Sequence, residues 1–75
     1  MKKWLSPKFN ERQWLGKRYC LYKTAEELNE LAAEILKFAN KGPHIKMHKR
    51  VKIKSEFCDV ERHLEKVWEL LEEYE

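Results

Sequence analysis

The stretch TAEELNELAAEIL, residues 24–36, places four carboxylates beside apolar residues that recur at helical spacing. Together with the good helix formers between them, these apolar residues predict one face of an amphipathic helix. Thr24 and Glu27 have the spacing of a capping box, in which each side chain accepts a hydrogen bond from a free backbone amide at a helix start. The apolar face consists of Leu28, Leu31, Ala32, Ile35, Phe38 and Ala39.

Beyond this stretch, the sequence predicts a turn and a second amphipathic helix. Residues 40–43, NKGP, should end the first helix, because glycine suits a helix C-terminus and proline cannot continue the helix. Apolar residues at steps of four and three then form a continuous stripe, with charge on the other faces. The stripe consists of Ile53, Phe57, Val60, Leu64, Val67 and Leu71. Because an isolated strand has no pairing partner, we expect residues 45–54 to form a loop that runs into this helix.

The segment before residue 24 predicts a shorter, separate helix. Residues 8–22 contain aromatic and leucine side chains among basic residues, and Gly16 is the weak point of that helix. The expected fold is therefore all-α, with a short N-terminal helix and a long antiparallel helical hairpin. A chain of 75 residues forms one domain, 1–75, and buries only about 60% of the surface that it exposes when unfolded. A second copy, pairing two hairpins into a four-helix bundle, would supply the missing contacts.

The composition indicates a soluble, reduced, cytoplasmic protein. Cys20 and Cys58 fit neither a disulfide framework nor a CxxC metal site. The N-terminus lacks the apolar core of a signal peptide. No apolar run approaches the roughly 20 residues that cross a bilayer, so we expect no membrane partner.

The net charge of +3 conceals a strong pattern of charged segments. Residues 1–23 carry a net +6 and residues 41–54 another +6, whereas residues 24–40 carry −3 and residues 55–75 carry −6. A protein that only coats nucleic acid would more commonly spread a basic stripe over its helices. Alternating acidic and basic segments suit a site in which carboxylates hold a metal ion and basic side chains hold a neighbouring phosphate.

Two pairs of acids are placed to meet across the hairpin. Glu27 and Glu30 lie three residues apart on one helix, and Glu56 and Asp59 lie three apart on the other, so each pair shares a helix face. Folding about Pro43 would set 27 opposite 59 and 30 opposite 56. Two like charges about 5 Å apart repel by roughly 3 kcal/mol at an effective dielectric near 20, so a cation should lie among them. Oxygen donors alone favour Mg²⁺, or Mn²⁺, over zinc.

These acids also carry a resemblance to a known family. Glu26-Glu27-Leu28-Asn29-Glu30 followed by Glu56-Phe57-Cys58-Asp59 resembles the EExxE…ExxD signature of the MazG-like, all-α nucleoside triphosphate pyrophosphohydrolases. The resemblance implies a MazG-like helical domain that works as a homodimer or a dimer of dimers. It also implies hydrolysis of a nucleoside triphosphate, between the α- and β-phosphates, to a monophosphate and pyrophosphate.

The resemblance assigns roles to individual residues. It implies that Glu27, Glu30, Glu56 and Asp59 hold Mg²⁺ and that Glu26 and Glu27 serve in catalysis. Glu26 would be either an outer-shell residue or a base that orients the attacking water. Only 16 residues follow Asp59, where many members of the family continue and take further phosphate contacts. The candidate substrate contacts in this chain are Lys52, Lys54, His63 and Lys66, together with Arg12 and the stacking candidate Trp14.

Each of these assignments has a structural alternative. The acids can be a solvated flank of two amphipathic helices, with Glu27 only a capping partner. Trp4, Trp14 and Trp68 can pack in the core or at a dimer contact, His63 can be a surface residue, and Lys46–Lys54 can be a solvated loop. The rival function is a non-catalytic small helical dimer that binds nucleic acid or a protein partner through its basic segments. A third reading is a family member that binds nucleotide without hydrolysing it.

Overall fold

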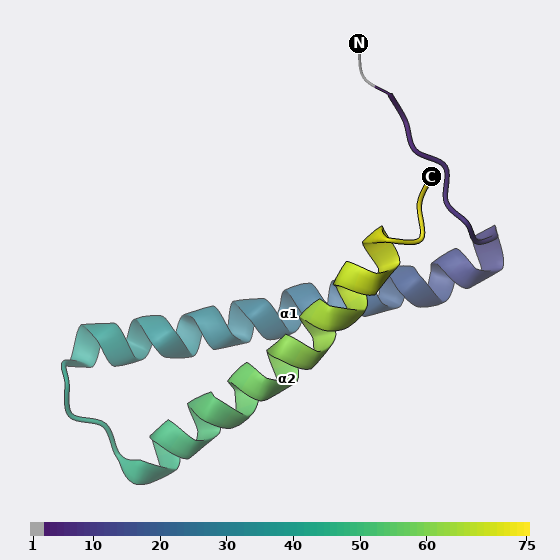
Figure 1. Cartoon of the computed structure of the whole chain (residues 1–75). Coiled ribbons are helices and arrows are strands. Elements are labelled where there is room, and N and C mark those ends of the chain that lie inside the picture. Colours follow the sequence, from purple (N-terminus) through teal and green to yellow (C-terminus); the bar gives the residue numbers. More distant parts are fainter. Residues whose placement is uncertain (1–2) are drawn as a thin grey trace.

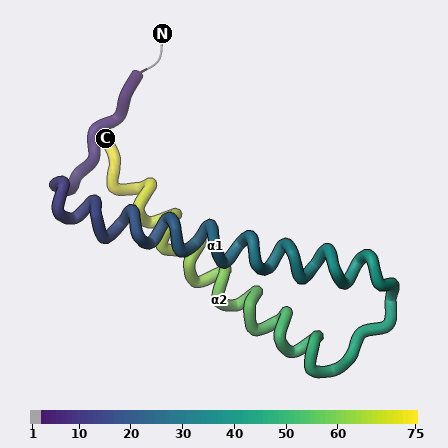
Figure 2. Tube along the Cα trace, turned by 180° about the vertical axis from the view of Figure 1, so that it is seen from behind, coloured from purple at the N-terminus to yellow at the C-terminus, as the bar shows by residue number. Residues whose placement is uncertain are grey.

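The protein folds as an all-helical hairpin. A computed structural model describes residues 3–75, whereas residues 1 and 2 of the expected domain lie outside the described residues. Helix α1 spans Glu11–Lys41 and helix α2 spans Met47–Leu71. The second helix runs back along the first in the opposite direction, and both chain ends lie away from the turn (Figures 1 and 2). The predicted hairpin of two packed helices is confirmed, and residues 3–75 form no strand.

The predicted short N-terminal helix is not a separate element, because α1 is one helix of 31 residues. It begins after Asn10, whose side chain accepts from the amide of Gln13 at 2.8 Å while the Gln13 side chain accepts from the amide of Asn10 at 2.9 Å. The capping box expected at Thr24 is therefore wrong. Thr24 lies within the helix, where its Oγ1 donates to the carbonyl of Cys20 at 2.7 Å. Gly16 does not break the helix, because a helical glycine costs only about 1 kcal/mol relative to alanine.

The turn between the helices follows the prediction. Helix α1 ends at Lys41, and Gly42 adopts φ 105° and ψ −173°. This backbone region is open almost exclusively to glycine. Pro43 follows directly, and α2 begins at Met47 with Ile53 inside it, so the loop does run into the helix as expected.

The contact line between the helices differs from the predicted apolar stripes. Thr24 and Leu31 on α1, with Val60 and Leu70 on α2, are buried. Most of the predicted stripe is instead on the surface. Its exposed members are Leu28, Ala32, Ile35, Phe38 and Ala39 on α1, with Phe57, Leu64 and Leu71 on α2. Each helix contacts the other through one narrow row of side chains. Because the apolar face of each helix is broader than one row, part of that face stays outside the contact.

This contact line divides the hairpin into an apolar side and a charged side. Glu27 and Glu56 are half-buried along the line. A step of one residue turns a helical side chain by about 100°, and because the helices are antiparallel the same step leads to the same side of both. Leu28 and Phe57, each one residue later, therefore share one side. We call this the apolar side, formed by Leu28 and Ile35 of α1 and by Phe57, Leu64, Trp68 and Leu71 of α2.

The hairpin is a single layer rather than a closed globule. Its radius of gyration is 16.8 Å, and it measures 48 × 29 × 15 Å. A compact chain of this length would have a radius of gyration of about 11 Å. The accessible surface of 6916 Å² likewise exceeds the roughly 4,900 Å² expected for a compact chain of this mass. Domains are usually built from two packed layers, whereas this chain forms one.

The two ends of the chain are joined at the open end of the hairpin. The backbone of Ser6 exchanges two hydrogen bonds with Glu75, at 2.8 and 2.9 Å, and Lys8 donates to the carbonyl of Glu73 at 2.8 Å. The Lys17 ammonium lies 2.6 Å from the Glu73 carboxylate. These contacts fix the extended segment before α1 against the end of α2.

The two glycines offer a matched test of the turn, because an added Cβ would meet no atom within 4 Å at either position. Gly42→Ala should lower the free energy of unfolding by about 1–3 kcal/mol, since alanine strains at this φ and ψ. Gly16→Ala should raise it by about 0.5–1 kcal/mol, since alanine is the better helix former. Urea unfolding followed by circular dichroism measures both, and effects of the same sign would contradict this account of the turn.

Candidate metal and substrate site

Two of the four predicted metal ligands lie in the contact line between the helices. The Glu27 side chain is 20% exposed, and its Oε1 lies 3.6 Å from the ammonium of Lys23, one helical turn earlier. Glu56 is half-buried on α2, and its Oε2 is buried without a hydrogen-bond partner. A buried acceptor without a partner costs about 1–3 kcal/mol, so Glu56 is an unsatisfied group in this chain.

The other two acids lie on the charged side of the same seam. Glu30 and Asp59 are exposed. Each follows its seam carboxylate by three residues, a step that turns the side chain by about 60° away from the apolar side on both helices. The four carboxylates therefore lie along one side of the hairpin, two within the seam and two beside it.

The carboxylates are not gathered into a closed metal centre. Within residues 3–75 there is no group of three or more His, Cys, Asp or Glu side chains arranged to hold a metal ion. Their chemistry nevertheless fits Mg²⁺, because all are oxygen donors and the buried oxygen of Glu56 is without a partner. The magnesium site stays a prediction.

The catalytic candidate Glu26 lies outside the seam. Its carboxylate lies 3.9 Å from the Lys23 ammonium, and its side chain is 69% exposed. Water reaches it freely, so Glu26 is placed beside the seam rather than within it.

Two further titratable side chains line the seam. His63 is half-buried rather than a surface residue, and its Nδ1 is buried without a hydrogen-bond partner. The side chain of Glu34 is 14% exposed and pairs with Lys37 at 3.5 Å. Glu34 is not among the site residues that the sequence predicts. Its spacing of seven residues from Glu27, which repeats the same helix face after two turns, was the pattern that could have revealed it.

The candidate substrate residues are spread along both helices, and most of them are exposed. Lys52, Lys54, Lys66 and Arg12 are exposed. Trp14 is stacked on Phe9, with ring centroids 6.1 Å apart and an interplanar angle of 7°. Thirteen residues of helix separate Trp14 from Glu27, a distance of about 20 Å at 1.5 Å per residue. Trp14 therefore packs against Phe9 at the open end.

Comparison with protein-family models, with curated proteins and with solved structures gave no match. The resemblance to the MazG-like family therefore rests on the residues of this chain. Among the described residues 3–75, no helix combines the length and apolar character needed to cross a membrane.

Because the buried Oε2 of Glu56 has no hydrogen-bond partner, we expect this side chain to lower the free energy of unfolding. Glu56→Leu should raise the free energy of unfolding by about 1 kcal/mol in metal-free buffer, because it removes a partly buried acceptor without a partner. Adding Mg²⁺ should then raise the melting temperature of the wild type but not of the variant.

Glu65→Leu, at an exposed position on the same helix, serves as the control and should leave the Mg²⁺ response unchanged. Differential scanning fluorimetry with and without EDTA measures these shifts. An equal Mg²⁺ response in wild type and Glu56→Leu would remove Glu56 from the metal site.

Proposed function

We propose that the chain is a magnesium-dependent nucleoside triphosphate pyrophosphohydrolase of the MazG-like kind. The observation that carries the proposal is the buried, unpartnered Oε2 of Glu56, on the helix that also carries Asp59. The EExxE and ExxD motifs lie on the two antiparallel helices of one hairpin, which supports the same proposal. The reaction gives a nucleoside monophosphate and pyrophosphate.

The proposed roles follow from the positions of the carboxylates. Glu27, Glu30, Glu56 and Asp59 would hold Mg²⁺, or Mn²⁺, which when bound neutralises the charge of the phosphate chain. Exposed Glu26 would accept a proton from the attacking water as the bond between the α-phosphorus and the bridging oxygen breaks.

Bases beside the acids would hold the substrate. Lys52 lies four residues before Glu56, about 6 Å along the helix, and Lys66 lies seven residues after Asp59. Lys54, two residues before Glu56, is turned by about 200° from it on the helix and would contribute only long-range attraction. These exposed ammonium groups would attract the phosphates of the substrate electrostatically.

A second copy of the chain would complete the fold. The surface in excess of that of a compact chain is about 2,000 Å² per chain, or about 4,000 Å² for a pair, which lies in the range of obligate homodimer interfaces. Much of it is apolar, because the apolar side exposes Phe57 at 50% and Trp68 at 68%. Packing two apolar sides together would form a four-helix bundle and leave the acids of both charged sides accessible.

Hydrolysis is tested by screening nucleoside triphosphates for pyrophosphate release in the presence of Mg²⁺. Asp59→Asn and Glu56→Gln should each lower kcat/KM by at least about a hundredfold, since even outer-shell partners of metal ligands cost 10- to 100-fold. EDTA should abolish release. Glu65→Gln, which removes an exposed acid of α2 outside the motif, should retain activity.

Two results would count against this function. Release that persists in Asp59→Asn would mean that other residues carry the activity. Failure of every common triphosphate, in a protein that is folded and binds Mg²⁺, would favour a nucleotide binder without turnover.

Association is tested at the apolar side. The double variant Phe57→Glu and Leu64→Glu should be monomeric in sedimentation equilibrium where the wild type is a dimer, because buried carboxylates would replace buried apolar groups. Arg62→Glu, at an exposed position one residue before His63 and hence toward the charged side, should still dimerise. A monomeric wild type at high micromolar concentration would contradict the bundle.

A further inference from the structure

The closed end of the hairpin carries a concentration of positive charge. Residues 35–55 contain seven Lys and Arg residues and no Asp or Glu. They form the last turns of α1, the turn itself and the first turns of α2. These bases are Lys37, Lys41, Lys46, Lys49, Arg50, Lys52 and Lys54.

Two bases of the open end have acidic partners from the end of α2. Lys8 lies 3.7 Å from a carboxylate oxygen of Glu75, and Lys17 lies 2.6 Å from one of Glu73. At the closed end, Lys37 pairs with Glu34 at 3.5 Å. The six other bases of residues 35–55 have no ion pair within the described residues. The positive charge of the closed end is therefore available to an external anion.

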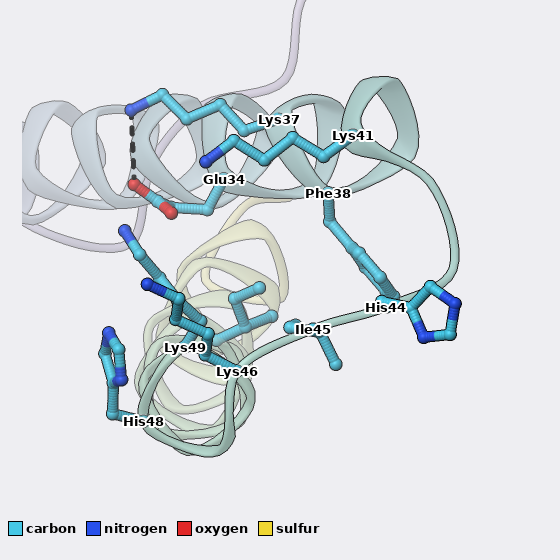
Figure 3. A pocket seen from close by; sticks show the side chains of 10 residues that line it. Glu34, Lys37, Phe38, Lys41, His44, Ile45, Lys46, His48 and Lys49 are labelled. Carbon is cyan, nitrogen blue, oxygen red and sulfur yellow. Dashed lines mark ion pairs between the residues drawn. The ribbon is translucent and has the colours of Figure 1, made fainter.

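Part of this charge surrounds a pocket of about 210 Å³ between the two helices and the turn. In Figure 3 the ammonium ends of Lys37, Lys41, Lys46 and Lys49 lie on the side of the pocket where Glu34 points. Phe38 lies on the other side, toward the turn. With both histidines neutral, four lysines and one carboxylate leave the lining with a net charge of +3.

The N-terminus of α2 is electrostatically destabilised unless an anion is bound there. The N-cap residue, Lys46, makes no side-chain capping hydrogen bond, and the first turn contains no acidic residue. The first turn instead contains Lys49 and Arg50. A helix N-terminus carries partial positive charge and free amides, so cations there are destabilising by roughly 0.3–1 kcal/mol each. A bound phosphate would satisfy the amides and the side chains together.

We propose that the closed end binds the sugar–phosphate backbone of a single-stranded nucleic acid. Seven bases spread over the ends of two helices and the turn suit a chain of phosphates better than one small anion. Phe38, 39% exposed at the pocket, adds an aromatic surface of the kind on which an unpaired base stacks. The site includes Lys46 and Lys49, which have no part in the proposed hydrolysis.

The test compares two double variants that remove the same charge from opposite ends. Lys46→Gln with Lys49→Gln alters the closed end, and Lys3→Gln with Lys8→Gln alters the open end. Fluorescence anisotropy with a labelled oligonucleotide of about 20 nucleotides is measured between about 50 and 200 mM salt. The closed-end variant should bind about tenfold more weakly, and the slope of log K against log salt should fall by about 1.4, or about 0.7 for each lost contact. The open-end variant should bind like the wild type.

Several results would overturn the proposal. Equal weakening by both double variants would mean that only the total charge matters. Absence of binding by the wild type at low salt would refute the site outright. Displacement of the oligonucleotide by inorganic phosphate, beyond the effect of sodium chloride at matched ionic strength, would assign the pocket to a small anion. Circular dichroism confirms that the variants keep their helical content.

Discussion

The narrow contact between α1 and α2 is the constraint on which the rest of the structure depends. The buried apolar side chains of residues 3–75 are Leu31, Val60 and Leu70. At about 1.5–3 kcal/mol each, three such side chains supply far less than the conformational entropy of ordering a chain of this length. The paired chain ends add further contacts, and in the proposed bundle a second copy would add more by covering the apolar side.

One rotation of the helices accounts for both the exposed apolar residues and the half-buried acids. Turning each helix so that Glu27 and Glu56 enter the contact line moves Leu28 and Phe57 onto the surface, because neighbouring residues on a helix lie about 100° apart. An arrangement with the apolar stripes in the seam would be more stable for an isolated chain. The observed arrangement is less stable for an isolated chain. It places the carboxylate oxygens of Glu27 and Glu56 in the seam, where a cation would bind, and leaves the apolar side open for packing against a second layer.

The hairpin and its turn could be predicted from the sequence, whereas the row of contact and the length of α1 could not. Residues 40–43 mark a helix end through local backbone chemistry, so Gly42 was identified correctly. On α1, the row of side chains that contains Glu27 and the row that contains Leu28 both repeat at helical spacing. Which of the two rows faces α2 depends on packing across the hairpin. Thr24 matches the pattern of a helix start because that pattern depends only on residues close in sequence. Within a helix the same hydroxyl can instead donate to a backbone carbonyl one turn earlier, here that of Cys20. The true start, Asn10 followed by Gln13, matched the same pattern.

The fold also explains why the charged segments alternate along the chain. An antiparallel hairpin brings residues 3–23 beside residues 55–75, so a basic and an acidic segment meet at the open end, as Lys17 and Glu73 do at 2.6 Å. The second basic segment crosses the turn, where the facing end of α1 carries one carboxylate, Glu34, which already pairs with Lys37. Most of the positive charge of this segment therefore has no ion pair within residues 3–75. The middle of the hairpin holds the four acids and the closed end the unpaired bases, so a cation and a polyanion would bind at neighbouring but separate places.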